Sequence, residues 1–449
     1  MSSAEIQASR HTADQPGLRA RGGRPRVAAA ASFDVVIVCD HAHISGGLAQ
    51  VAVASARGLR RRGHRVIFFA AMPPIDPSLL QAGVEVVCLG QPDMLRDPSR
   101  LKAAGRALWN TGAARELADL LASLDHHRAI VHVHGWSKAL SPSILRVCRR
   151  AGAAAVHTLH DYVAVCPNGA LFNYVKRQNC TLRPMSVGCL VSNCDARHYG
   201  HKLWRVGRHL ALTSLGGALA GEDVIYISKA QREIVAPLLP ADTRLHYLPN
   251  PVDVEDRGPA DVAANDSFVF IGRLSQEKGA AVFAEAARRA GVKALFVGDG
   301  PMRQTILSTA AGAAITGWVD NARVMAHLRR ARALVFPSLW YETFGLSVHE
   351  ALANGVPPIV SDNTVSAEAL EHEVTGLLFR SGDVDDMMAQ IRRLSDGDTA
   401  KRIGRAAYDR YWRDAPTLDR HVDGLEQLYG LLLCERPGKG KNHGRGHRA

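Results

Sequence analysis

The feature that most constrains the fold is a repeated alternation between short β-branched runs and helical patterns. It begins at residue 33 with FDVVIVC, passes through a helical pattern over residues 48–62, and returns to strands at RVIFFA, VEVVCL and AIVHVH. Strands that alternate with amphipathic helices are typical of a parallel sheet covered on both faces. We therefore predict an α/β fold with a doubly wound first domain.

A second alternation follows residues 251–267, which are rich in Asp, Ala, Pro and Gly and are typical of a linker. It runs through FVFIG, a helix over residues 281–290, KALFVG, ARALVFPS, a helix over residues 346–354 and PPIVS. Ligands of such sheets bind at the carboxyl ends of the strands. Two alternating halves therefore predict two Rossmann-like domains that face a cleft holding the site.

Domain boundaries follow from these breaks in the pattern, and a chain of 449 residues has room for two or three domains. We expect a first Rossmann-like domain over residues 33–255 and a second Rossmann-like domain over residues 266–410. A helical region over residues 411–434 could pack back on the first domain. The predicted basic, disordered tails are residues 1–32 and 435–449.

The net charge of +12 is unevenly distributed along the chain. Residues 1–32 carry +3, residues 435–449 carry +4 and residues 162–211 carry +6, which leaves the rest at −1. Tails of this composition attract anions loosely, and we find no aromatic-plus-basic RNA signature. The sequence therefore predicts no specific nucleic-acid partner.

Cysteine usage and hydropathy bear on the compartment. No run of 18 or more apolar residues occurs, so we expect no membrane-spanning helix. Eight cysteines are scattered through a chain without a recognisable secretory signal, which favours reduced thiols. We expect a cytoplasmic protein. The alternative location is a peripheral one, at the inner face of the membrane.

The alternation of strands and helices is interrupted by a Cys-rich basic insertion over about residues 162–211. Four of its thiols could hold a structural zinc ion, although only the last pair approaches the usual Cys-x2–4-Cys spacing. Buried reduced cysteines or a disulfide explain the pattern equally well. The candidate ligands are Cys166, Cys180, Cys189 and Cys194.

The cations of this insertion stand beside Tyr174, Tyr199 and Trp204. Such a surface suits a ligand that carries phosphate, such as a lipid-linked saccharide at an anionic membrane surface. A solvated basic surface without a ligand is the alternative.

The second half contains residues suited to a nucleoside diphosphate. In GRLSQEKG, Arg273 and Lys278 follow a strand and can meet a diphosphate, although such cations are commonly just exposed side chains. In ETFGLSVHE, Glu342 precedes a helix whose free N–H groups attract phosphate, and Glu350 lies within that helix. Glu350 can accept hydrogen bonds from a ribose diol or can simply complement the helix dipole.

These motifs, with VGDGP, TGWV and SDNTVSAEALEHEVTGLLF, resemble the retaining glycosyltransferases of family 4, which have the GT-B fold. The resemblance covers residues 33–433. It implies that Arg273 and Lys278 bind the donor diphosphate, that Glu342 lies beside the donor sugar and that Glu350 holds the ribose. The positions implied to contact the donor through the backbone or near the base are Phe344, Gly345, Leu346 and Trp318.

In the first domain, the resemblance extends to Gly46 and Gly47 in the family's glycine-rich loop and to His160, a catalytic position in TLHDY. The segment 363–366 departs from the family, which usually has a glycine pair there, while Glu368 stands at the matching acidic position. This departure bears on how the backbone closes around the donor.

The resemblance implies a nucleotide-sugar donor, retention of anomeric configuration and no need for a divalent metal or other cofactor, since fixed cations and a helix N-terminus can neutralise the leaving diphosphate. It also implies that the domain over residues 33–255 binds the acceptor and that the domain over residues 266–410 binds the donor. The expected acceptor is a glycan or lipid-linked saccharide in cell-surface or exopolysaccharide biosynthesis. The alternatives are a GT-B-fold nucleotide-sugar epimerase or phosphorylase, and a non-catalytic binding protein on this fold.

Overall fold

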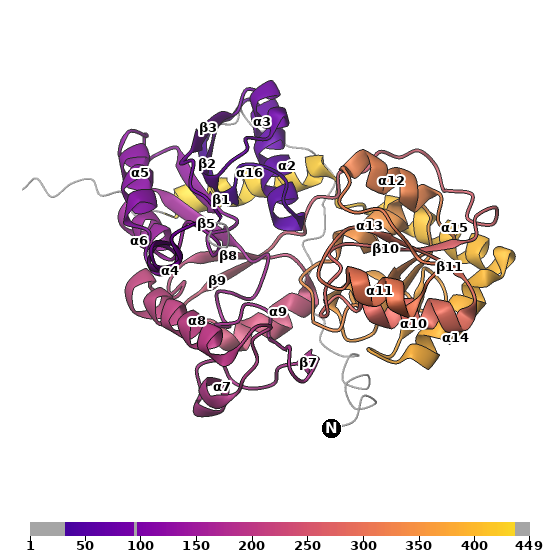
Figure 1. The fold of residues 1–449 in the computed structure, drawn as a ribbon. Coiled ribbons are helices and arrows are strands. Elements are labelled where there is room, and N and C mark those ends of the chain that lie inside the picture. Colours follow the sequence, from indigo (N-terminus) through magenta and orange to yellow (C-terminus); the bar gives the residue numbers. More distant parts are fainter. Residues whose placement is uncertain (1–31, 94–96, 436–449) are drawn as a thin grey trace, which may run out of the picture. The chain divides into compact units, whose positions relative to one another are not determined.

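Two parallel sheets organise the computed structural model, which describes residues 32–93 and 97–435 (Figure 1). The predicted tails, residues 1–32 and 435–449, lie outside the described residues except at Ser32 and Glu435. The first sheet has the order β3-β2-β1-β4-β5-β8-β9, and the second has the order β12-β11-β10-β13-β14-β15. Every strand pair within the two sheets is parallel, so the carboxyl ends of each sheet's strands share one edge.

The first half of the chain supplies the seven-stranded sheet and its helices. Its strands are β1 (Asp34–His41), β2 (Arg65–Met72), β3 (Glu85–Cys88), β4 (Ala129–Val133), β5 (Ala154–Thr158), β8 (Asp223–Tyr226) and β9 (Arg244–Tyr247). Its helices are α2 (Gly47–Arg61), α3 (Pro77–Gln81), α4 (Arg100–Leu108), α5 (Thr111–Ala122), α6 (Ser143–Arg150), α9 (Lys229–Val235) and the 3-10 turn η2 (Ala236–Leu238).

Between β5 and β8 the chain leaves this sheet. The segment contains the antiparallel pair β6 (Phe172–Asn173) and β7 (Gln178–Asn179), followed by α7 (Val187–Val191), α8 (Tyr199–Ala211) and the π-helical turn η1 (Leu212–Gly216). We call residues 159–222 the β5–β8 segment. It corresponds to the stretch in which the sequence pattern breaks.

The second half forms the six-stranded sheet. Its strands are β10 (Ser267–Ile271), β11 (Lys293–Val297), β12 (Ala314–Ile315), β13 (Ala333–Phe336), β14 (Pro358–Ser361) and β15 (Leu377–Phe379). Its helices are α10 (Ala280–Ala290), α11 (Arg303–Thr309), α12 (Asn321–Arg329), α13 (Leu346–Ala353), η3 (Val365–Ala369), α14 (Val384–Ser395) and α15 (Gly397–Arg413).

Burial on both faces explains why the strands of the first sheet are apolar without interruption. In β1, Val35 and Ile37 belong to a core shared with α2, whereas Val36 and Val38 belong to a second core shared with α5 and α6. Successive side chains of a strand point to opposite faces, so a strand covered on both sides needs apolar residues at every position. The sheet is therefore buried between two helical layers.

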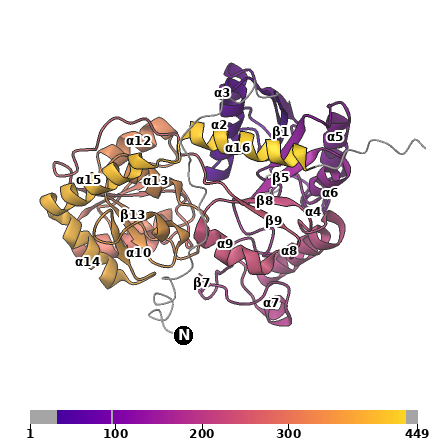
Figure 2. The ribbon, with the colours of Figure 1, turned by 180° about the vertical axis from the view of Figure 1, so that it is seen from behind.

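The last helix, α16 (Leu418–Cys434), returns to the first sheet and packs beside α2, as the two opposite views show (Figures 1 and 2). Leu425 and Tyr429 lie in the same core as β1, and His421 Nε2 hydrogen-bonds to Ser55 Oγ at 3.1 Å. Helix α16 thus completes the apolar core on one face of the first sheet.

Among the described helices, none combines the length and hydropathy needed to cross a membrane.

Candidate functional site

A pocket of about 670 Å³ is lined by residues of both halves of the chain: strand ends and loops of the second half, and loops and the start of α2 from the first. Its floor lies where β10, β11 and β13 end, which is the strand edge expected for a ligand of such sheets. All of the predicted catalytic and donor-binding residues line this pocket: Gly46, Gly47, His160, Arg273, Lys278, Trp318, Glu342, Phe344, Gly345, Leu346 and Glu350. The sequence pattern therefore selected residues that the fold brings together, whereas their individual roles stay predictions.

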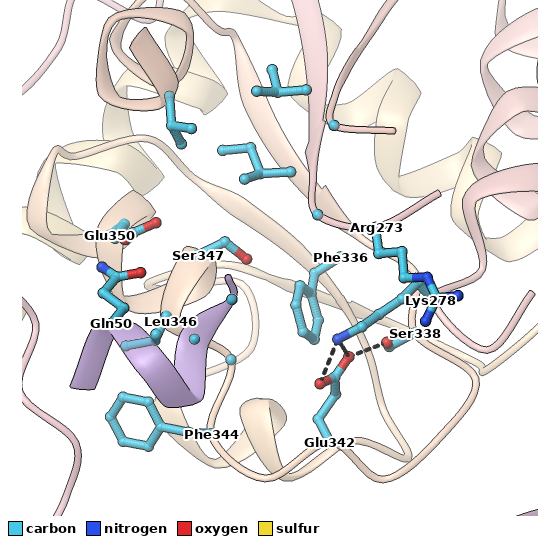
Figure 3. Close-up of a pocket in the computed structure, with 18 of the residues that line it drawn as sticks. Gln50, Arg273, Lys278, Phe336, Ser338, Glu342, Phe344, Leu346, Ser347 and Glu350 are labelled. Carbon is cyan, nitrogen blue, oxygen red and sulfur yellow. Dashed lines mark hydrogen bonds and ion pairs between the residues drawn. The ribbon is translucent and has the colours of Figure 1, made fainter. Parts of the chain in front are cut away.

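Two helix N-termini meet in this pocket. Gly46 precedes α2 and Gly345 precedes α13, and neither helix start is capped by a side chain. The two starts are close enough that a Cβ on Gly47 would lie 3.1 Å from Leu346 Cδ1 (Figure 3). Uncapped N–H groups and aligned dipoles from two helices make this part of the pocket attractive to an anion.

Gly345 occupies a position where the backbone conformation and the close packing both require glycine. Its φ is +82°, and a Cβ there would lie 2.1 Å from Ser366 Oγ. Any larger residue would both strain the backbone and collide with η3. The segment 363–366, which departs from the family's pattern, thus supplies the wall against which this glycine packs.

Lys278 and Glu342 form an ion pair in the pocket. Lys278 Nζ donates to Glu342 Oε1 at 2.7 Å and to Oε2 at 2.8 Å, and Ser338 Oγ also donates to this carboxylate (Figure 3). The Glu342 side chain is 7% exposed and the Lys278 side chain 27%. Residues that the sequence suggested for separate parts of the donor are therefore in direct contact, so a ligand that binds Lys278 also meets the charge of Glu342.

The backbone of Glu342 is held in an unusual conformation. Its φ is +58°, in the left-handed region that non-glycine residues seldom occupy. Tyr162 OH donates to the Glu342 carbonyl at 2.5 Å, and Thr343 Oγ1 donates to the His160 carbonyl at 3.0 Å. Two hydrogen bonds to the first half of the protein therefore fix this loop, which is how a strained residue is maintained at a binding site.

Glu350 has no cationic partner within the described chain. It is 6% exposed, and burial raises its pKa to about 7, while a hydrogen bond with Gln50 of α2 opposes that rise. Figure 3 shows the two side chains facing each other across the helix starts. Near neutral pH this carboxyl can either accept hydrogen bonds as a carboxylate or donate one as an acid.

His160 stands on the first-sheet side of the pocket. Its Nε2 shares a hydrogen bond with His134 Nδ1 at 2.9 Å, and burial lowers the pKa of His160 to about 3. The imidazole is therefore neutral at physiological pH and can donate or accept a hydrogen bond with a hydroxyl group. His132 lies against His134 and hydrogen-bonds to Tyr429 OH at 2.7 Å, which connects this wall to α16.

The remaining predicted residues differ in exposure. Trp318 is 74% exposed at the rim, so a planar base could stack on it without rearrangement. Arg273 is also exposed and points toward Lys278 (Figure 3). Glu368 does not line the pocket, because its carboxylate accepts hydrogen bonds from the backbone N–H groups of Lys229 and Ala230 at the start of α9.

Some pocket residues were not anticipated from the sequence. Three of them contact predicted residues: Gln50, Ser338 and Trp340. Gln50 hydrogen-bonds with Glu350, and Ser338 Oγ donates to the Glu342 carboxylate. Lys278 Nζ lies 5.2 Å from the centroid of the Trp340 ring. The signal available for Gln50 was its place in the first turn after Gly46 and Gly47. Ser338 and Trp340 stand just after β13, where a systematic reading of strand ends would have included them.

The predicted zinc ligands do gather in the β5–β8 segment. Cys166, Cys180, Cys189 and Cys194 line one small cavity together with Lys202, whose ammonium donates to the carbonyls of Cys189 and Ser192. Within residues 32–93 and 97–435, however, no three His, Cys, Asp or Glu side chains are arranged to hold a metal ion. All eight cysteines belong to this described part and are free thiols, so the disulfide alternative is not realised here either.

Comparison with known proteins places this geometry in a family. The profile described as "Glycosyltransferase Family 4" matches residues 45–256, and the profile "Glycosyl transferases group 1" matches residues 261–410. The first covers much of the half that carries His160, and the second covers the half that carries both glutamates. Together they cover every strand of the two sheets except β1, and every pocket-lining residue except Ile44.

Two curated relatives illustrate the range of sequence similarity. The chain is 28% identical over 150 residues to a 2-deoxystreptamine N-acetyl-D-glucosaminyltransferase of Niallia circulans, a match covering 31% of this chain but only 38% of that relative. It is 25% identical over 328 residues to the UDP-Gal:alpha-D-GlcNAc-diphosphoundecaprenol alpha-1,3-galactosyltransferase of Escherichia coli, covering 67% of this chain and 74% of that protein.

Solved structures resemble the chain over nearly its whole length. A sucrose-phosphate synthase from Thermosynechococcus elongatus superposes with a TM-score of 0.63 at 17% identity, covering 89% of this chain and 99% of its own. HepE of Anabaena, solved with UDP and glucose, gives 0.62 at 16% identity with the same coverages. At such identities the likeness establishes the shared fold. The chain is a member of the family 4 glycosyltransferases, with the GT-B fold of two Rossmann-like halves.

Proposed function

We propose that the protein transfers a sugar, with retention of anomeric configuration, from a nucleoside diphosphate sugar to a saccharide acceptor in the synthesis of a cell-surface or exported polysaccharide. The observation that carries this proposal is the convergence of two uncapped helix starts, two cations and two buried glutamates on one pocket. The UDP named for the Escherichia coli relative and for HepE makes a UDP-hexose the first donor to test.

The pocket has a suitable group for each part of such a donor. The diphosphate would lie at the starts of α2 and α13, where Arg273 and Lys278 add positive charge. Glu350 would accept hydrogen bonds from the ribose hydroxyls, and Trp318 would stack on the base. The sugar would extend toward Glu342 and His160, both of which can hydrogen-bond hydroxyl groups.

The chemistry follows from this placement. The acceptor hydroxyl oxygen bonds to the anomeric carbon while the bond from that carbon to the diphosphate oxygen breaks, and the acceptor proton passes to the departing diphosphate. Lys278, Arg273 and the helix starts stabilise the negative charge that develops on the leaving group. Because these fixed groups supply the positive charge, we propose that transfer requires no divalent metal. Glu342 would stabilise the positive charge on the sugar ring.

Donor hydrolysis provides the test. The protein would be incubated with UDP-, GDP- and ADP-hexoses without an acceptor, and the first-formed sugar anomer would be followed by proton NMR, with and without a chelator. We expect one nucleotide class to be cleaved slowly, with the donor's anomer released first and no effect of the chelator. Inverted product would contradict retention, and conversion to another sugar nucleotide would indicate an epimerase. Absence of both cleavage and nucleotide binding would contradict the proposal.

A further inference from the structure

A second cavity, of about 270 Å³, lies beside the donor pocket, and we call it the α8 cavity. One wall is α8, which contributes Trp204, Arg205 and Arg208, and the opposite wall includes Trp340 from the second half of the chain. The remaining lining residues come from the loop after β4, the β5–β8 segment and the loop after β10: Ser137, Lys138, Asp161, Val163, Asn168, Gly169, Ala170, Tyr174, His201 and Glu277.

Arg208 is a buried cation without a direct counter-ion among the described residues. It is 7% exposed, its Nη1 donates to the Ser137 carbonyl at 2.8 Å, and its guanidinium lies 5.6 Å from the centroid of the Trp204 ring. Burial lowers its pKa to about 10. A buried guanidinium that uses so few of its five N–H donors is costly unless an anion completes its partners.

The nearby carboxylates have other hydrogen-bond partners, although Asp161 and Asp40 attract Arg208 electrostatically. Asp40 accepts the backbone N–H groups of residues 138–140, at 2.8–3.0 Å, and Asp161 accepts the Val163 N–H at 3.0 Å. Asp195 pairs with Arg205 and His201, and Glu277 accepts from Ser275 Oγ. Arg208 forms no ion pair with any of these groups.

Two further donors in this cavity lack partners. Trp204 and Trp340 line the cavity, and the indole Nε1 atom of each is buried without a hydrogen-bond acceptor among the described residues. Buried indole N–H groups usually find one. A ligand rich in acceptor oxygens would satisfy both indoles and the guanidinium, and the flat faces of the rings suit a sugar.

The α8 cavity and the donor pocket have a lining residue in common. Trp340 lines both, Lys278 Nζ lies over the Trp340 ring, and Asp161 of this cavity directly follows His160 of the donor pocket. A saccharide held here would therefore lie next to the end of the donor pocket where Glu342 stands. A donor alone would leave the second cavity empty.

We propose that the α8 cavity is the acceptor subsite, and that it binds a saccharide carrying an oxyanion, a phosphate or a carboxylate, through Arg208 and the two indole N–H groups. This inference rests on the proposed glycosyl transfer and adds to it the chemical class of the acceptor. Arg208 acts in it as a binding residue for the acceptor.

The test measures ligand binding directly. Saturation-transfer NMR on the full-length protein, with and without UDP, would compare glucose 1-phosphate and glucuronic acid with uncharged methyl glucoside. The variant Arg208→Gln removes the charge while keeping an N–H donor for Ser137, and Arg183→Gln, an exposed residue of the same segment, is the matched control. Trp204→Phe removes one indole N–H and retains an aromatic ring.

We expect an anionic probe to bind the wild type more tightly than methyl glucoside, and Arg208→Gln to weaken that binding by about ten-fold or more while Arg183→Gln leaves it unchanged. Preference between the two anionic probes would identify phosphate or carboxylate as the group recognised. If Arg208→Gln does not fold, weaker anion binding by Trp204→Phe serves instead. Equal binding of charged and uncharged probes, or unchanged binding in the variants, would overturn the inference.

A UDP titration separates the two proposals. Normal UDP binding with no anion effect would overturn the acceptor subsite alone. Failure of the wild type to bind any nucleotide would instead overturn the proposed transfer, whatever the anionic probes do.

Discussion

The two glutamates of the donor pocket lie eight residues apart and have opposite electrostatic surroundings. Glu342 is paired with Lys278 and receives a further hydrogen bond from Ser338. Glu350 has no cation beside it among residues 32–93 and 97–435, and burial raises its pKa to about 7. The same residue type therefore forms an ion pair at one end of the pocket, whereas at the other end burial raises its pKa to about 7.

This contrast has a structural origin. Glu342 lies in a loop that the rest of the protein holds in a left-handed conformation facing the strand ends, where Lys278 can reach it. Glu350 projects from α13 toward the start of α2 and meets only the neutral Gln50. The Glu-x7-Glu spacing determines where the two side chains stand, whereas residues that are remote in the sequence determine their partners: Lys278 of the same half for Glu342, and Gln50 of the opposite half for Glu350.

Among the substitutions that test this difference between the two glutamates, removal of Lys278 should have the largest effect on stability and activity. Lys278→Ala would leave the buried Glu342 carboxylate without its partner, so we expect about 3 kcal/mol of destabilisation in urea unfolding. Loss of a charged contact to the donor should also lower kcat/KM about 10–100-fold. Lys293→Ala is the control, because Lys293 forms an exposed ion pair with Asp266 that should be worth less than about 1 kcal/mol. Equal stability of the two variants would refute the assigned difference.

The second prediction concerns the pH dependence of Glu350. A carboxyl whose pKa is raised from 4.5 to about 7 stabilises the fold fully below pH 4.5, and that contribution is lost as the pH rises toward 7. Glu350→Gln cannot ionise, so it should gain about 2 kcal/mol relative to wild type between pH 5 and pH 8 in urea unfolding. The exposed Glu116→Gln should show no such change.

Ligand binding gives the same prediction a second measurement. Ribose hydroxyls donate to the ionised form of Glu350, so wild-type affinity for the preferred nucleotide should increase from pH 6 to pH 8. Calorimetric titration of Glu350→Gln should give a weaker affinity with a flatter pH profile. A variant that follows the wild-type profile would remove Glu350 from the ribose site.

Gly345→Ala tests the loop that separates the two glutamates. The new Cβ would meet Ser366 Oγ at a φ of +82°, so we expect about 1–2 kcal/mol of destabilisation and weaker nucleotide binding. Gly312→Ala, where the Cβ has open space, is the matched control for thermal unfolding. Indistinguishable melting temperatures would contradict the close packing described here.

Trp318→Ala should have the smallest effect. The side chain is 74% exposed, so unfolding should shift by less than about 0.5 kcal/mol. Loss of stacking on the base should weaken nucleotide binding by about 1 kcal/mol, a several-fold change detectable by calorimetry. The same affinity for wild type and variant would exclude Trp318 from the base site.

The sequence predicted the α/β alternation, the two halves and the residues that line the donor pocket. It could do so because strand and helix periodicity are local, and because loops at the carboxyl ends of parallel strands necessarily share one edge. It did not predict that Lys278 and Glu342 are in contact, since residues 64 positions apart meet only through the sheet. It also did not anticipate Gln50 beside Glu350.

The β5–β8 segment shows the same division more sharply. From the sequence, its cysteines suggested a metal and its cations a basic surface, because composition and spacing were the only information. In the folded protein Lys202 lines the cavity of the four thiols, and Arg208 is buried beside Trp204. Burial and pairing of a charge depend on neighbours that no local pattern specifies.

By itself, the sequence determined the class of fold and the chemistry available at its strand ends, because both follow from local periodicity and from residue types at turns. Only the tertiary structure decided which carboxylate is paired, which histidine stays neutral and which arginine lies buried without an ion pair in the described part of the chain. Those properties depend on distances and dielectric surroundings created when remote segments pack together.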